Sequence, residues 1–179
     1  TTAFDGMRDK KWLVDHLPAD GSAQLADLTA KWATVCVWGP NARSLVQSCT
    51  DDDMSNAAFP FATCKWVDFG PIRALASRFS YVGELGWEIH VPFEQGARLW
   101  DILWEAGQPY GVAPIGLGVV GTSARLEKGY RATGNELDPD WDLVEAGLAR
   151  PRVKPQDFIG KAAYLRQRAE EPAARLCTL

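Results

Sequence analysis

Residues 64–92 of the chain read CKWVDFGPIRALASRFSYVGELGWEIHVP, and this stretch decides the fold class. Its β-branched and aromatic residues predict strands at 64–69, 72–79 and 85–91, because such side chains pack well on a pleated surface. The links between these strands are short and contain glycine and proline, which is typical of turns between antiparallel neighbours. The stretch therefore predicts three consecutive antiparallel strands.

The sequence on either side adds a fourth strand and several helices. Residues 32–38, WATVCVW, predict a strand that stops at Gly39-Pro40. Apolar residues at helical spacing predict a short helix after Pro40, a helix over 93–104 with Gly107 as its C-cap, and further helices over 117–130 and 160–170. This order predicts the α+β class, with helices packed on one face of a largely antiparallel sheet, rather than a doubly wound fold.

Composition excludes several classes of protein. The chain has 179 residues, of which 46% are hydrophobic and 23% charged, as in ordinary globular domains. A net charge of −4 gives no basic footprint for nucleic acid, and no apolar run approaches the roughly 18 residues of a membrane span. The four cysteines form no Cys-x-x-Cys pair, so we expect core residues in a reducing compartment: Cys36, Cys49, Cys64 and Cys177. We therefore expect a cytosolic or organelle-matrix protein with neither nucleic acid nor membrane as partner.

A glycine motif in the second half of the chain matches the pattern of a dinucleotide-binding loop. Residues 116–121, GLGVVG, match G-x-G-x-x-G, and Asp138 follows at a suitable distance. The fingerprint requires a buried strand before it and a parallel βαβ unit around it. The preceding residues 112–115 are few and include Pro114. We therefore predict no dinucleotide site here.

The strand at 85–91 presents two chemically different faces. Side chains alternate along a strand, so Trp87, Ile89 and Val91 share the core face, while Glu88 and His90 share the other. Either the second face is merely solvated, or Glu88 receives two N–H groups of a polar heterocycle beside Tyr81, as a carboxylate can. The spacing alone favours the solvated interpretation.

Four motifs that occur together and in order favour the ligand-binding interpretation of Glu88 over the solvated one. They are Trp38-Gly39-Pro40-Asn41-Ala42-Arg43, Ser80-Tyr81-Val82-Gly83-Glu84-Leu85-Gly86-Trp87-Glu88, Arg125-Leu126-Glu127-Lys128-Gly129-Tyr130-Arg131 and Asp157-Phe158-Ile159-Gly160-Lys161. With them the chain resembles the folate-binding aminomethyltransferase family, typified by the T-protein of the glycine cleavage system. The same module forms the C-terminal half of sarcosine and dimethylglycine dehydrogenases. Trp87 and residues 128–131 resemble this dehydrogenase-linked branch more closely.

The resemblance implies a folate-binding α+β fold with tetrahydrofolate as the acceptor of a one-carbon unit. It places Tyr81 and Glu88 in the pterin pocket, with Glu88 accepting from the pterin's amino and ring N–H groups. Glu84 is expected mainly to shape the turn. The full set of candidate cofactor-binding residues is Tyr81, Glu84, Trp87, Glu88 and Arg125. We assign no catalytic residue and no metal ligand.

The chain departs from the family pattern in two respects. The family's catalytic aspartate precedes the part represented here, so whether these residues are an enzyme by themselves is left open. A folate-contacting arginine of the family aligns with Gly121. We expect a fragment in which residues 1–150 form a partial folate-binding domain lacking its N-terminal segment, and residues 151–179 form a linker, a helix and the start of a C-terminal β domain.

The resemblance supports one main function and two alternatives. The main one is tetrahydrofolate-dependent aminomethyl or methylene transfer within a larger enzyme like the T-protein or the two dehydrogenases. Its partners would be folate, a small methylated amine or an aminomethyl carrier, and an upstream flavin domain holding FAD. The location would be the bacterial cytoplasm or the mitochondrial matrix. The alternatives are a non-catalytic docking module of the same fold, supported by Gly121 and the Trp-rich helix at 93–104, and a folate-dependent demethylase.

Overall fold

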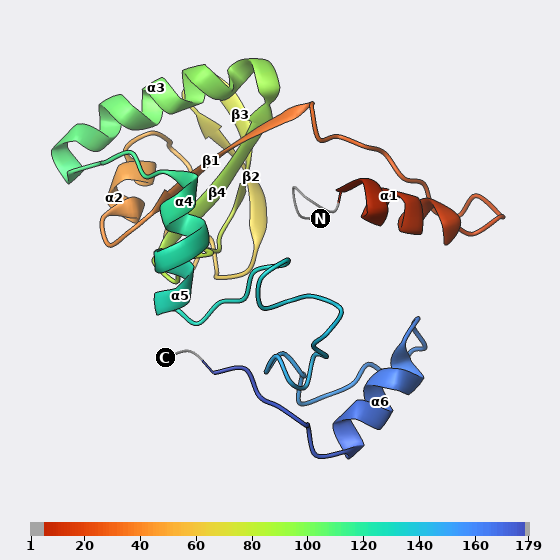
Figure 1. Cartoon of the computed structure of the whole chain (residues 1–179). Helices are drawn as coiled ribbons and strands as arrows, with labels where there is room; N and C mark the ends of the chain where they lie inside the picture. The colour runs from red at the N-terminus through yellow and green to blue at the C-terminus, as the bar shows by residue number, and fades with distance from the viewer. Residues whose placement is uncertain (1–5, 178–179) are drawn as a thin grey trace. The chain divides into compact units, whose positions relative to one another are not determined.

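The structure is a computed structural model that describes residues 6–177. The chain separates into two compact units, one up to Gly116 and the other from Leu117 onward. Figure 1 labels the helices and strands of both units.

The first unit is built around a four-stranded sheet. Its elements, in chain order, are α1 (Gly6–Asp15), β1 (Trp32–Trp38), α2 (Ala42–Gln47), β2 (Cys64–Phe69), β3 (Ile72–Ser77), β4 (Gly86–Pro92) and α3 (Gly96–Gly107). The strand order is β1-β4-β3-β2, and every neighbouring pair is antiparallel. The predicted α+β class with an antiparallel sheet is confirmed.

Helices α2 and α3 cover one face of the sheet. Both helices contact β1 and β4, and α3 runs along the sheet in Figure 1. Their buried residues, among them Leu45, Val46, Leu99 and Leu103, join alternate residues of the strands in one apolar core. On β4 these are Trp87, Ile89 and Val91, all fully buried. The predicted alternation along β4 is therefore confirmed.

The end of α3 differs from the expectation. Gly107 is the last residue of α3, but the left-handed residue that stops the chain is Gly111, with a φ of 73°, after a 3₁₀ turn over Gln108–Tyr110. Gly107 is required for packing instead: a Cβ there would lie 2.6 Å from the Cβ of Val112 and 2.8 Å from Cδ1 of Leu45. The glycine lets the helix end approach α2 closely.

Three further elements differ from the expectation. Helix α1 was not anticipated: it buries no residue, and its Lys11–Asp15 ion pair, 2.6 Å long, lies on the exposed surface. Strand β3 ends at Ser77 rather than at residue 79. Within residues 151–179, where we expected the start of a C-terminal β domain, residues 174–177 form no strand, and residues 178–179 lie outside the described part.

The second unit is mainly helical turns and loops. Helices α4 (Leu117–Val119) and α5 (Arg125–Glu127), joined by a π-helical turn, form the helical stretch predicted for this region, and α6 spans Lys161–Ala169. Between 117 and 177 the only strand pairing described is an isolated bridge between Thr133 and Leu137. The glycine motif at 116–121 thus has no strand–helix–strand unit around it. None of the helices described between residues 6 and 177 has the length and apolar character needed to cross a membrane.

Candidate functional site

The sheet face opposite α2 and α3, called the open face below, carries two rows of side chains fixed by strand register. The first row is formed by Cys36 on β1, Glu88 on β4, Ser77 on β3 and Cys64 on β2. The second row is formed by Thr34, His90, Leu75 and Trp66 on the same four strands. Cα partners in an antiparallel pair project their side chains to the same side. The polar residues predicted on one face of β4 therefore meet polar partners from neighbouring strands.

Glu88 occupies the middle of the first row. Its side chain is half-buried, and burial raises the pKa of its carboxyl group above the ordinary value. Within residues 6–177 no hydrogen bond or ion pair engages this carboxylate. Burial, together with the neighbouring charge of Glu88, also raises the pKa of the Cys36 thiol to about 11. Glu88 is thus a desolvated acceptor next to a neutral thiol.

His90 lies in the second row and is held by Thr34. Its Nδ1 is 2.9 Å from the Thr34 hydroxyl oxygen. Burial lowers the pKa of the His90 ring below the ordinary value of 6.5, so the imidazole is neutral at pH 7. The open face therefore presents one carboxylate and one neutral imidazole side by side on the same strand.

The loop between β3 and β4, which carries Tyr81, is tied to the end of β1. The Trp38 indole N–H donates to the Phe79 carbonyl at 3.2 Å, and the Gly39 amide donates to the Leu85 carbonyl at 2.8 Å. A Cβ at Gly86 would lie 2.0 Å from the Val37 carbonyl oxygen, so only glycine permits this approach. The first two sequence motifs therefore form one local structure.

The comparison with protein families fits this arrangement. The model of the GCVT N-terminal domain matches residues 1–153. The chain belongs to this family. The resemblance inferred from the four motifs is confirmed.

Curated relatives of this chain come from two groups of enzymes. Mitochondrial dimethylglycine dehydrogenase of Mus musculus is 35% identical over 176 residues, which is 97% of this chain and 20% of the relative. An aminomethyltransferase of Geobacillus kaustophilus (strain HTA426) is 36% identical over 176 residues, 97% of this chain and 47% of the relative. Mitochondrial sarcosine dehydrogenase of Homo sapiens is 37% identical over 155 residues, 86% of this chain and 17% of the relative. The chain thus spans from about a fifth to less than half of the length of these relatives.

A solved structure is also similar to part of the chain. It is the heterotetrameric sarcosine oxidase from Corynebacterium sp. U-96 in complex with pyrrole 2-carboxylate. The match has a TM-score of 0.47 and 19% identity, and it covers 55% of this chain and 49% of the other. A likeness of this extent supports no argument about the site.

Of the candidate residues, Trp87 lies on the opposite side of the sheet from a ligand on the open face. Its side chain is fully buried in the core. The ring has the guanidinium groups of Arg43 and Arg78 at 5.6 and 5.8 Å from its centroid, and its centroid lies 6.1 Å from that of Phe59. We therefore remove Trp87 from the cofactor-binding set. Glu84 lies exposed in the loop before β4.

Arg125 belongs to the second unit and is engaged there. Only 3% of the residue is exposed. Its guanidinium donates to the Glu136 carboxylate at 2.6 Å and to the carbonyls of Gly121 and Tyr130 at 2.8 and 3.0 Å. The hydrogen bond from Arg125 lowers the pKa of the Glu136 carboxyl group. These contacts give Arg125 a structural role that the motif alone could not reveal.

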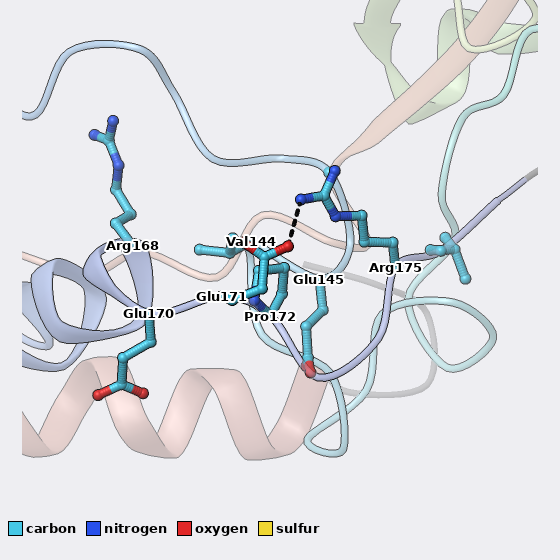
Figure 2. A pocket seen from close by; sticks show the side chains of 9 residues that line it. Val144, Glu145, Arg168, Glu170, Glu171, Pro172 and Arg175 are labelled. Carbon is cyan, nitrogen blue, oxygen red and sulfur yellow. Dashed lines mark hydrogen bonds and ion pairs between the residues drawn. The ribbon is translucent and has the colours of Figure 1, made fainter.

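Two surface hollows lie in the second unit, and neither includes Tyr81 or Glu88. Figure 2 shows the first, of about 440 Å³, in which Arg168 and Glu170 point in opposite directions and Arg175 pairs with Glu171 at 3.2 Å. The second, of about 500 Å³, is lined in part by Arg125 and its partner carboxylate. Among the described residues, 6–177, no three His, Cys, Asp or Glu side chains gather as a metal-binding group. Of the candidate residues, Glu88 lies on the open face and Tyr81 in the loop that precedes β4, and these two define the candidate site.

The raised pKa of Glu88 predicts how stability depends on pH. Because the folded state holds this proton more tightly than the unfolded state, stability falls as pH rises from about 4.5, the ordinary value, through the folded-state pKa. Glu88→Gln removes the charge, so we expect a higher melting temperature than the parent at pH 7 and no difference at pH 4. Thermal unfolding followed by circular dichroism at both values checks this. An equal difference at pH 7 and pH 4 would assign the effect to packing instead.

Proposed function

We propose that this chain is a tetrahydrofolate-dependent one-carbon transfer domain, acting on aminomethyl or methylene units as part of a larger enzyme. The observation that carries the proposal is the Glu88 carboxylate, which is half-buried and unpaired within the described residues and lies on the open face of the sheet. Desolvating a carboxylate without a partner is unfavourable, and groups whose pKa is shifted by desolvation cluster at functional sites. Family membership supplies the chemical context.

A pterin ring matches this carboxylate chemically. Its 2-amino group and ring N3–H are two adjacent donors, and one carboxylate can accept both. Because the site is partly desolvated, these charge-assisted bonds are stronger than they would be in water. Tyr81, from the loop fixed by β1, would pack or hydrogen-bond beside the ring. Tetrahydrofolate supplies N5 and N10, which accept the one-carbon unit.

The residues of this chain contribute binding and orientation. Glu88 would hold the pterin end, and the rigid connection between the Tyr81 loop and β1 would fix the ring relative to the sheet. Such positioning lowers the entropic barrier to transfer. We propose that a small methylated amine or an aminomethyl carrier provides the one-carbon unit, and that FAD belongs to a separate flavin domain.

We propose a location in the bacterial cytoplasm or the mitochondrial matrix. The relatives include mitochondrial dehydrogenases and bacterial aminomethyltransferases, which supports these two compartments. Both are reducing, which fits the free thiols of the described residues. Of these, Cys36, Cys64 and Cys177 are exposed and do not lie in the core as expected.

A docking module is the second candidate function. On α3, the rings of Trp100 and Trp104 stack with centroids 6.2 Å apart, and the two residues are 46% and 36% exposed. Exposed aromatic pairs of this kind occur at protein interfaces. In this reading the family fold persists without binding folate.

Isothermal titration with tetrahydrofolate separates the two functions. We expect the parent protein to bind, and Glu88→Ala to weaken binding by about 10- to 100-fold, the range for a hydrogen-bonded charged group. Glu94→Ala serves as the matched control, because Glu94 is an exposed carboxylate six residues later and lies outside the candidate set, and it should leave the affinity unchanged. Equal affinity of the parent and Glu88→Ala would remove Glu88 from the site, and absence of binding by the parent would favour the docking module.

A further inference from the structure

His90 shares the site of Glu88 through the geometry of β4. The two residues are two positions apart on one strand, so their Cα atoms lie about 7 Å apart and their side chains project to the same face. Strand β4 is an inner strand of the sheet. Glu88 is therefore flanked by Cys36 and Ser77, and His90 by Thr34 and Leu75. With neighbours on both sides, both side chains are directed outward over the same area.

The Thr34 hydroxyl determines which nitrogen of His90 is free. It lies 2.9 Å from Nδ1, and the imidazole is neutral because burial lowers its pKa. If the hydroxyl donates to Nδ1, the single ring proton resides on Nε2. Within residues 6–177 the structure gives Nε2 no hydrogen-bond partner. His90 would then present a fixed N–H donor beside the two acceptor oxygens of Glu88.

This set of groups complements one edge of a 2-amino-4-oxopteridine. That edge presents the 2-amino N–H, the N3–H and the 4-oxo oxygen in order, which is two donors followed by one acceptor. Glu88 offers two acceptors and His90 one donor. We infer that His90, oriented by Thr34, is a specificity-determining residue that donates from Nε2 to the 4-oxo group while Glu88 holds the amino and N3–H groups. The inference rests on the proposed function and names the part of the ligand that this chain distinguishes.

The test compares two ligands and four variants of the full chain. The ligands are tetrahydrofolate and its 4-amino analogue, in which an amino group replaces the 4-oxo group and N3 carries no hydrogen. We expect His90→Phe to weaken tetrahydrofolate binding by about tenfold, the typical effect of losing such a hydrogen bond, and to leave binding of the 4-amino analogue nearly unchanged. For each protein we compare the ratio of its affinity for tetrahydrofolate to its affinity for the 4-amino analogue. A change in this ratio in His90→Phe reports on the contact to the 4-oxo group, because a merely structural role would weaken binding of both ligands equally.

Thr34 provides a matched pair of variants. Thr34→Ser keeps the hydroxyl and should retain the parent's ratio of affinities for tetrahydrofolate and the 4-amino analogue. Thr34→Val removes the hydroxyl and should lower this ratio. Nitrogen-15 NMR of the His90 ring gives an independent readout. We expect the proton on Nε2 in the parent and in Thr34→Ser, and a mixture of the two neutral forms in Thr34→Val.

The outcomes separate this inference from the proposed function. One outcome is that Glu88→Ala loses tetrahydrofolate binding while His90→Phe keeps the parent's preference for tetrahydrofolate over the 4-amino analogue. That outcome would overturn the role of His90 alone. A ring proton found on Nδ1 in the parent would overturn it as well. Failure of the parent to bind either ligand would overturn the proposed function and the inference together.

Discussion

Trp87→Ala is expected to lower the free energy of unfolding by about 3–5 kcal/mol, the usual cost of removing a large buried aromatic side chain. Trp87 is 0% exposed and is the largest fully buried side chain of the core. Its ring packs beside Phe59 and lies near the guanidinium groups of Arg43 and Arg78, so truncation leaves a cavity and removes the aromatic face from two cations. Urea unfolding followed by circular dichroism measures the change.

Two variants serve as controls for the Trp87 prediction. Trp66→Ala removes a ring that is 46% exposed on the open face, and we expect a loss within about 1 kcal/mol. Trp87→Phe keeps an aromatic ring and removes the indole Nε1, which is buried without a hydrogen-bond partner; it should cost less than Trp87→Ala. A loss for Trp87→Ala no larger than that for Trp66→Ala would contradict its place in the core.

Arg125→Ala should destabilise the second unit by about 3–5 kcal/mol, as expected when one partner of a buried ion pair is removed. The Arg125 side chain is 4% exposed, and its Glu136 partner, 2.6 Å away, is 23% exposed. Glu136 also accepts from the Ala132 amide at 3.0 Å, so its carboxylate connects Arg125 to the backbone at Ala132. Amide hydrogen exchange over residues 125–137 measures the effect within this unit.

An exposed pair of the same chemistry provides the control. Arg73 and Asp68 lie 2.8 Å apart but are 59% and 57% exposed. Arg73→Ala should change the free energy of unfolding by no more than about 1 kcal/mol, as for surface ion pairs. Similar losses for Arg73→Ala and Arg125→Ala would show that burial does not set the strength of these pairs.

The sheet could be predicted because its strands carry the signal locally. Residues 32–38 and 64–92 combine β-branched and aromatic side chains with short glycine-containing links, and the observed strands follow them closely. Helix α1 gave no such signal, because it packs no apolar face into the core. The cap after α3 was misplaced because Gly107 is required by contacts with Val112 and Leu45, which only the folded structure reveals.

The candidate site could be predicted in part. Alternation along β4 was enough to separate Glu88 and His90 from the core residues, since it depends only on neighbouring positions. The same rule should have excluded Trp87, which shares the core face with Ile89 and Val91. Cys36 and Thr34 could not be found in this way, because register between strands distant in sequence is not encoded in either strand alone. Likewise, the structural role of Arg125 depends on Glu136, eleven positions further along the chain.

The strand order has a consequence for the time at which the open face appears during folding. The β2–β3 and β3–β4 pairs join segments close in sequence, whereas the Thr34–His90 contact closes a separation of 56 positions. Local hairpins form before pairings that require a long loop to close. During synthesis β1 leaves the ribosome before the other three strands. It can pair only after β4, the strand that carries both Glu88 and His90, has also emerged. The open face is thus complete, with Glu88 and His90 beside their cross-strand neighbours, only in a chain whose sheet has formed in full.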